Sequence, residues 1–182
     1  MKTSVVQIVF VLTSTVFAAA VQDMWPTFGG VKPPLLLALV MHWAVLRRPA
    51  ERSHREGPPF YAARWIPAAI FAGAFEDALS GFPSGCATGC FLLAGAAARF
   101  TRAAWPETPP ALFGLVGLML AAPLHELWLA VWGVAGDEPS AFIRFFAAAL
   151  PAAPVGALTF LAMPRLERLV GFEGPERAGG QP

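Results

Sequence analysis

The sequence predicts an all-α, polytopic membrane protein with about six transmembrane helices. Of 182 residues, 56% are hydrophobic and 14% are charged, and the mean hydropathy is +0.56. A single soluble core of this size could not bury so much apolar surface. Phenylalanine (15) and tryptophan (6) greatly outnumber the single tyrosine, a bias toward rings that tolerate hydrocarbon. Charged residues also separate the apolar runs, as expected where spans of about 20 residues reach water.

The first three spans are expected at residues 5–21, 28–46 and 65–79. The first ends where Asp23 and a proline follow. The second contains Lys32 near its start, so it is short unless that side chain snorkels to the surface. The third carries Glu76 and Asp77 near its end, and the glycines and proline of residues 81–85 then predict a tight turn.

The first run also resembles a secretory signal whose cleavage site would be the small residues before position 22. A single basic residue precedes the run, and the run is somewhat long for the apolar part of a signal. We therefore expect a retained first span rather than a cleaved one.

The last three spans are expected at residues 82–98, 109–132 and 145–163. A pair of arginines closes the fourth span, and His125 and Glu126 lie in the distal half of the fifth. Pro151 and Pro154 lie inside the sixth, where they predict a kink or local unwinding.

The basic residues predict how the chain is oriented. Eleven lysines and arginines fall in connections on one side of the expected spans, and only Lys32 and Arg144 fall on the other. Basic residues are retained in the cytoplasm, so both termini are expected there. Residues 1–170 form one expected transmembrane domain, and the tail, residues 171–182, is expected to be disordered and cytoplasmic. A net charge of +1 gives no reason to expect nucleic-acid binding.

Carboxylates inside a spanning segment are costly and mark candidate functional sites. Glu76 and Asp77 fit this description, although Gly81 and Pro83 follow closely and place the pair near the membrane surface. Gly73, Asp77 and Gly81 recur every four residues, a stripe that can press closely on a neighbouring helix. A packing or partner-contact role for Asp77 is favoured over catalysis.

A second candidate is a polar intramembrane site formed by Glu76, His125, Glu126 and Arg144. Glu126 could be neutral, paired with Arg144, or located at the membrane–water interface. Trp128, which follows it, favours the interfacial location. A proton or ion pathway would need further polar groups on facing helices, which the other spans scarcely offer.

Cys86 and Cys90 lie four residues apart on the fourth expected span. No further cysteine or histidine follows at zinc-like spacing, so we expect packing rather than a metal or other cofactor. Gly81, Gly85 and Gly89 form a ladder of small residues that predicts a packing face.

Two stretches carry a resemblance to a known family. Residues 32–49 place prolines before a leucine-rich span that ends in basic residues, and residues 73–85 form a Gly-x-x-x-Asp-x-x-Ser-Gly-x-Pro-x-Gly turn. Together they resemble MreD, the rod shape-determining membrane proteins, which agree in size and number of spans. The matching turn residues are Asp77, Ser80, Gly81, Pro83 and Gly85. The departures from the pattern are Glu76, His42-Trp43 and His125-Glu126.

The resemblance implies a non-enzymatic component of the bacterial cell-elongation machinery in the cytoplasmic membrane. Its implied partner is the bitopic protein MreC, and through it the actin-like MreB, RodA and a class B penicillin-binding protein. The family's fold is similar to that of substrate-binding components of energy-coupling-factor vitamin transporters. A transporter component is therefore the alternative, and it would need an outward cavity lined by Glu76, Asp77, His125, Glu126 and Arg144. A membrane enzyme would need clustered nucleophiles, bases or metal ligands, which the sequence does not show.

Overall fold

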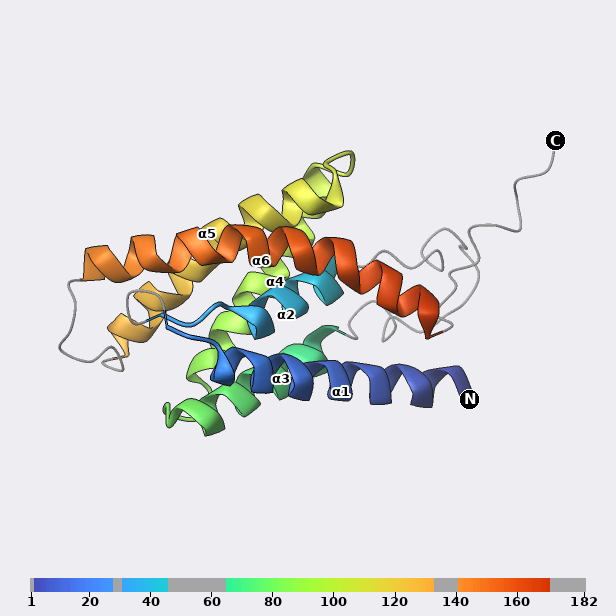
Figure 1. Cartoon of the computed structure of the whole chain (residues 1–182), viewed down its shortest axis with the longest axis horizontal. Helices are drawn as coiled ribbons and strands as arrows, with labels where there is room; N and C mark the ends of the chain where they lie inside the picture. Colours follow the sequence, from blue (N-terminus) through green and yellow to red (C-terminus); the bar gives the residue numbers. More distant parts are fainter. Residues whose placement is uncertain (1, 28–30, 46–64, 133–140, 171–182) are drawn as a thin grey trace.

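The computed structural model describes residues 2–27, 31–45, 65–132 and 141–170. These ranges contain six helices and no strand, so the all-α prediction is confirmed (Figure 1). The helices are α1 (Lys2–Met24), α2 (Leu35–Val45), α3 (Trp65–Ser80), α4 (Cys86–Ala104), α5 (Pro110–Val131) and α6 (Ala141–Leu169). The expected cytoplasmic loop at residues 47–64 and the expected disordered tail lie outside the described residues.

Successive helices run in opposite directions through the bundle (Figure 1). The C-terminal ends of α1, α3 and α5 and the N-terminal ends of α2, α4 and α6 lie toward one end, which we call the distal end. The start of α1 and the end of α6 lie at the opposite end. Any group gathered at the distal end therefore comes from residues widely separated in the sequence.

The short helix α2 lies at the centre of the bundle. It contacts all five other helices, and its residues 36–44 are buried. The expected second span began at residue 28, but this helix begins only at Leu35. The reason is the Pro33-Pro34 pair, because prolines lack the backbone donor and push the preceding residue out of the helical region. Its 11 residues reach about 16 Å, roughly half of a bilayer core.

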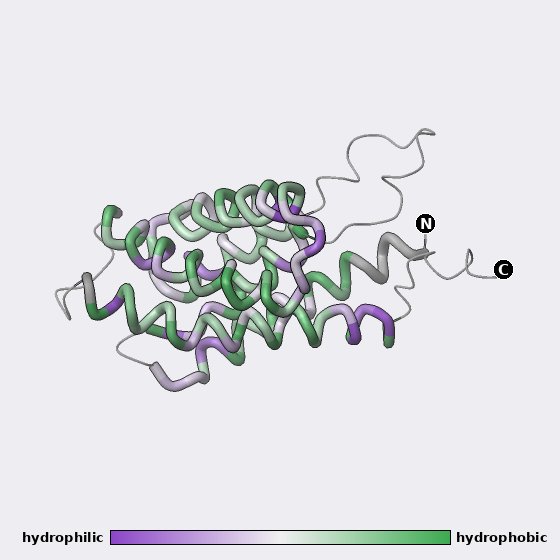
Figure 2. The backbone as a smooth tube through the Cα atoms, turned by 90° about the horizontal axis from the view of Figure 1, so that it is seen from above, coloured by the Kyte–Doolittle hydropathy of each residue, from purple (hydrophilic) through white to green (hydrophobic). Residues whose placement is uncertain are grey.

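Small residues fill much of the core beside the buried large side chains of α2 and Phe91, whereas many other large apolar side chains face outward. Ala69, Ala72 and Ala148 are fully buried, while Leu120 is 62% and Leu158 64% exposed. Soluble proteins bury their large aliphatic residues, whereas helices in membranes pack through small ones. Figure 2 shows hydrophobic residues along the helices and hydrophilic residues mostly toward their ends.

Two helices in the described ranges are long and apolar enough to cross a membrane. They are Pro110–Val131, which is α5, and Ile143–Leu169 within α6. The apolar segments Ile8–Met24 and Leu35–Val45 are shorter. Among the described residues, two of the six expected spans therefore have the length and apolar character of a membrane-crossing helix.

The α5–α6 pair is the most extensive helix contact, and it depends on two glycines. A Cβ added to Gly156 would lie 2.1 Å from the carbonyl oxygen of Gly114, and one added to Gly114 would lie 2.4 Å from the carbonyl oxygen of Gly156. The two backbones therefore touch, as small residues allow in membrane helices. The helix α6 continues unbroken through Pro151 and Pro154, so local unwinding does not occur there.

Candidate functional site

Asp77, near the end of α3, caps the following helix. Its side chain is buried, and Oδ2 accepts a hydrogen bond from the Gly85 N–H at 2.9 Å while Oδ1 accepts one from the Ala87 N–H at 2.7 Å. The hydroxyl of Thr88 also donates to Oδ2, at 3.4 Å. The first N–H groups of a helix have no partner within the helix, and a negative charge beside them is favourable. Asp77 thus joins the end of α3 to the start of α4.

The turn between these helices requires glycine at two positions. Gly81 has φ +68° and Gly85 has φ +95°, backbone conformations that residues with a Cβ rarely adopt. The N–H of Cys86 donates to the carbonyl oxygen of Pro83 at 3.1 Å, which starts α4. The fourth helix therefore begins at Cys86, four residues later than expected, because the turn occupies residues 81–85.

The glycines of the expected stripe and ladder have different environments. A Cβ on Gly73 would lie 2.3 Å from Cα of Thr88, so this glycine serves the α3–α4 contact within the chain. Gly81 and Gly85 lie in the turn, so the ladder they were expected to form on a helix with Gly89 is wrong. A Cβ on Gly89 would meet nothing closer than 3.5 Å, the ring of Trp128.

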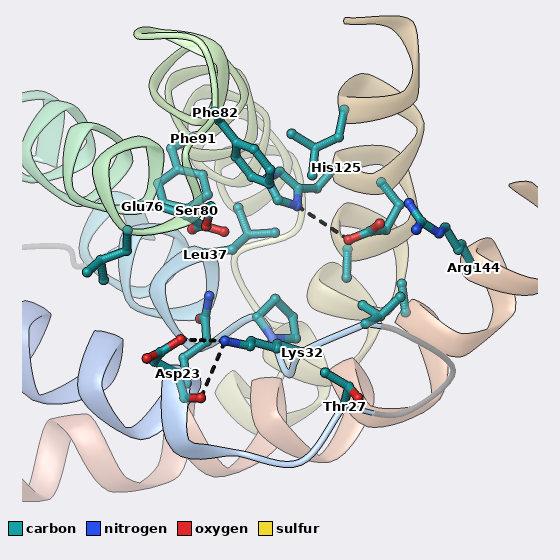
Figure 3. Close-up of a pocket in the computed structure, with 18 residues that line it drawn as sticks. Asp23, Thr27, Lys32, Leu37, Glu76, Ser80, Phe82, Phe91, His125 and Arg144 are labelled. Atoms are coloured by element: carbon teal, nitrogen blue, oxygen red, sulfur yellow. Dashed lines mark hydrogen bonds and ion pairs between the residues drawn. The ribbon is translucent and has the colours of Figure 1, made fainter. Parts of the chain in front are cut away.

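A polar cavity of about 370 Å³ opens among the helices toward the distal end (Figure 3). All six helices contribute to its wall. It brings together Glu76, His125, Glu126 and Arg144, the four residues of the expected polar site. Asp77 does not line it, because its carboxylate faces the start of α4. The polar side chains that sequence reasoning did not assign to this site are Gln22, Asp23, Thr27, Lys32 and Ser80.

Two pairs of opposite charge lie in the cavity wall. Lys32 Nζ forms an ion pair with the carboxylate of Asp23, and it also donates to the Asp23 carbonyl oxygen at 3.3 Å. Arg144 lies close enough to Glu126 for electrostatic attraction. On the other side of Glu126, its Oε1 lies 4.0 Å from His125 Nδ1, which is too long for a hydrogen bond.

Gln22 connects α1, α2 and α3 at the cavity wall. Its Oε1 accepts a hydrogen bond from the Leu36 N–H at 3.1 Å, and its side chain lines the cavity together with Glu76. Glu76 is only 8% exposed. Among the described residues, no basic side chain forms an ion pair with it.

Polar atoms of the cavity wall remain without partners. His125 is 6% exposed, and its Nε2 has no hydrogen-bond partner in the described part of the chain. Nε of Arg144 is likewise buried and unpartnered there. Buried polar atoms are nearly always hydrogen-bonded in native proteins, so these atoms indicate capacity for a bound group. Within the described residues, no group of three histidine, cysteine or acidic side chains could hold a metal ion.

At the opposite end, the buried His42 and the half-buried Glu167 join α2 to α6. Nε2 of His42 lies 3.3 Å from Oε1 of Glu167, and His42 is 3% exposed. The ring of Phe160 meets the His42 ring edge-on, with centroids 5.2 Å apart. Sequence reasoning gave no role to Glu167; the one signal was a histidine in an otherwise apolar helix.

Two features thus stand out as candidates for function: the capped α3–α4 turn and the distal polar cavity. No protein-family model, no curated protein and no solved structure matches this chain.

Proposed function

We propose that this chain is a non-enzymatic membrane scaffold of the bacterial cell-elongation machinery, similar to MreD. In this role it docks an MreC-like bitopic protein and, through it, links the MreB cytoskeleton to peptidoglycan synthesis by RodA and a class B penicillin-binding protein. The α3–α4 turn carries the proposal. The resemblance to MreD rests on its residues, and Asp77, Gly81 and Gly85 each have a structural role there that demands their residue type. The spacing of the motif therefore has a physical cause.

The proposed topology has all six helices within the cytoplasmic membrane and both termini inside. The short α2 is compatible with this topology because it contacts helices rather than lipid on its sides. Arg102 near the end of α4 and Arg168 near the end of α6 lie at the end opposite the cavity. Retention of basic residues in the cytoplasm would then leave the cavity on the outer side.

A scaffold also needs surface for partner helices. The outward faces of α5 and α6 present large apolar side chains, among them Leu120, Leu150 and Leu158, each at least 62% exposed. In a membrane these faces contact lipid or another transmembrane helix. We assign contact with partner transmembrane helices to part of this surface, and we assign no catalytic reaction to the chain.

The distal cavity favours a second candidate, the substrate-binding component of a small-molecule transporter. Its volume of about 370 Å³ is within the range of small-molecule sites, and its wall carries Glu76, His125 and Arg144. A transporter component would need a cavity of this kind that opens on the outer side of the membrane.

Affinity purification of the tagged chain from native membranes separates the two candidates. The scaffold predicts co-purification of a bitopic protein with an MreC-like periplasmic domain, identified by mass spectrometry. Co-purification of an ATPase module instead, with no bitopic protein, would contradict the scaffold and support the transporter component. Asp77→Ala, which disrupts the turn, should reduce recovery of the bitopic partner, whereas Ser80→Ala at the same turn should not.

A further inference from the structure

The distal cavity has a charge imbalance that identifies the kind of group it can bind. Two cations and three carboxylates line it. Lys32 is matched by Asp23, and Arg144 lies beside Glu126. Glu76 is the carboxylate left over, and within the described residues it has no cationic partner. A buried carboxyl group without a counter-charge is costly to ionise, so a cation bound beside it would stabilise the ionised form.

His125 lines the same cavity and supplies a hydrogen-bond acceptor in addition to the carboxylate of Glu76. Nδ1 of His125 lies 4.0 Å from Oε1 of Glu126, too far for a hydrogen bond, and we assign the ring proton to Nδ1, on the side of that carboxylate. Nε2 is then a lone-pair acceptor, and it is buried without a partner in the described part of the chain. A ligand that satisfies both groups must donate hydrogen bonds and carry positive charge.

The rest of the wall is apolar and aromatic. Phe91 and Phe82 both line the cavity. Phe91 is fully buried, and the centroid of its ring lies 5.9 Å from the centroid of the His125 ring. Leu37 and Leu129 add aliphatic surface. Aromatic faces attract cations, and aliphatic surface favours the carbon skeleton of an amphiphile (Figure 3).

We propose that the cavity binds the ammonium group of a small amphiphilic amine. The ammonium donates to the carboxylate of Glu76 and to Nε2 of His125, and the apolar part of the ligand packs against Phe91 and Leu37. The turn contributes Ser80 and Phe82 to the cavity wall, but the capping residue Asp77 does not line the cavity, so this proposal does not depend on the scaffold function. Such an ammonium group could belong to a free amine or to the headgroup of phosphatidylethanolamine.

Isothermal titration calorimetry on the full chain in detergent tests the chemistry with a series of matched probes. Phenethylamine carries the ammonium and 2-phenylethanol replaces it with a neutral hydroxyl. The proposal predicts saturable 1:1 binding of phenethylamine and at least tenfold weaker binding of 2-phenylethanol. Absent saturable binding of phenethylamine, or equal binding of the two probes, would overturn it. This comparison uses the unaltered chain and is independent of whether any variant folds.

A matched pair of variants locates the site. Glu76→Gln keeps the shape of the side chain and removes its charge, and it should weaken phenethylamine binding at least tenfold. Glu107→Gln, an exposed acid outside the cavity, should leave binding unchanged. Equal affinity of Glu76→Gln, folded as judged by circular dichroism, would overturn the assignment.

Native mass spectrometry of the chain from bilayer nanodiscs distinguishes the two sources of the ammonium group. Preferential retention of one phosphatidylethanolamine over phosphatidylcholine, displaced by phenethylamine, would assign the lipid headgroup. Phenethylamine binding without such retention would assign a free amine. If neither molecule is retained, the proposal is wrong.

Discussion

Removing the carboxylate of Asp77 should break the hydrogen bonds that hold the start of α4 to the end of α3. Asp77→Ala deletes two backbone hydrogen bonds, at 2.7 and 2.9 Å, and leaves the N–H of the fully buried Ala87 without an acceptor. Hydrogen bonds to a charged group contribute about 1.5–3 kcal/mol each, so the loss of two should be about 3–6 kcal/mol. Asp77→Asn keeps one acceptor oxygen and should lose roughly half as much.

The two cysteines of the chain provide a local assay for this effect. Cys86 and Cys90 are buried, free, and lie in the first turns of α4 beside the cap. If the free energy of locally unfolding this region falls by about 3 kcal/mol, maleimide should label the thiols about a hundredfold faster. Ser80→Ala is the control, because this exposed residue of the same turn should shift stability by less than about 0.5 kcal/mol.

The cap interpretation fails if Asp77→Ala labels at the unaltered rate. It also fails if Ser80→Ala accelerates labelling as much as Asp77→Ala does. Labelling that rises for alanine, rises less for asparagine and stays constant for the control would match the hydrogen-bond geometry.

Three further predictions concern packing, the His42–Glu167 pair and the outer surface. Gly156→Ala should lower the free energy of unfolding in detergent by about 1–3 kcal/mol, because the new methyl would meet an α5 carbonyl oxygen at 2.1 Å. Gly89→Ala, with its nearest contact at 3.5 Å, should be neutral or stabilising by up to about 1 kcal/mol, and equal losses would refute the packing account. Glu167→Ala should cost about 1–3 kcal/mol because it removes the acceptor facing His42, while Glu167→Gln should cost less than about 1 kcal/mol; the reverse order in thermal unfolding would contradict this. Leu158→Lys on the outward face of α6 should disfavour membrane insertion by about 2.5–3.5 kcal/mol in a glycosylation assay, and unchanged insertion would argue that this face meets water.

The sequence predicted helix positions best where charges and prolines mark both ends. The fifth span was expected at residues 109–132, and α5 covers Pro110–Val131. The second and fourth helices begin later than expected, at Leu35 and Cys86, because hydropathy does not register backbone geometry. Prolines before one helix and glycines with positive φ before the other set those starts.

The cavity was only partly predictable. Glu76, His125, Glu126 and Arg144 were recognised as costly polar residues in apolar surroundings, but hydropathy alone does not say that they meet. Their meeting follows from the order of six helices in space, which depends on close contacts such as Gly114 with Gly156. The remaining polar residues of the wall were not assigned to the site because they lie at or just beyond helix ends, where polar residues are ordinary.

Conditional depletion of this chain in its native host, scored for cell shape by microscopy, tests the proposed function most directly. The scaffold predicts that depleted rod-shaped cells round and swell, and that a plasmid copy restores the rods while an Asp77→Ala copy does so poorly. Depleted cells that keep their shape and instead require a nutrient would contradict the scaffold and favour the transporter component.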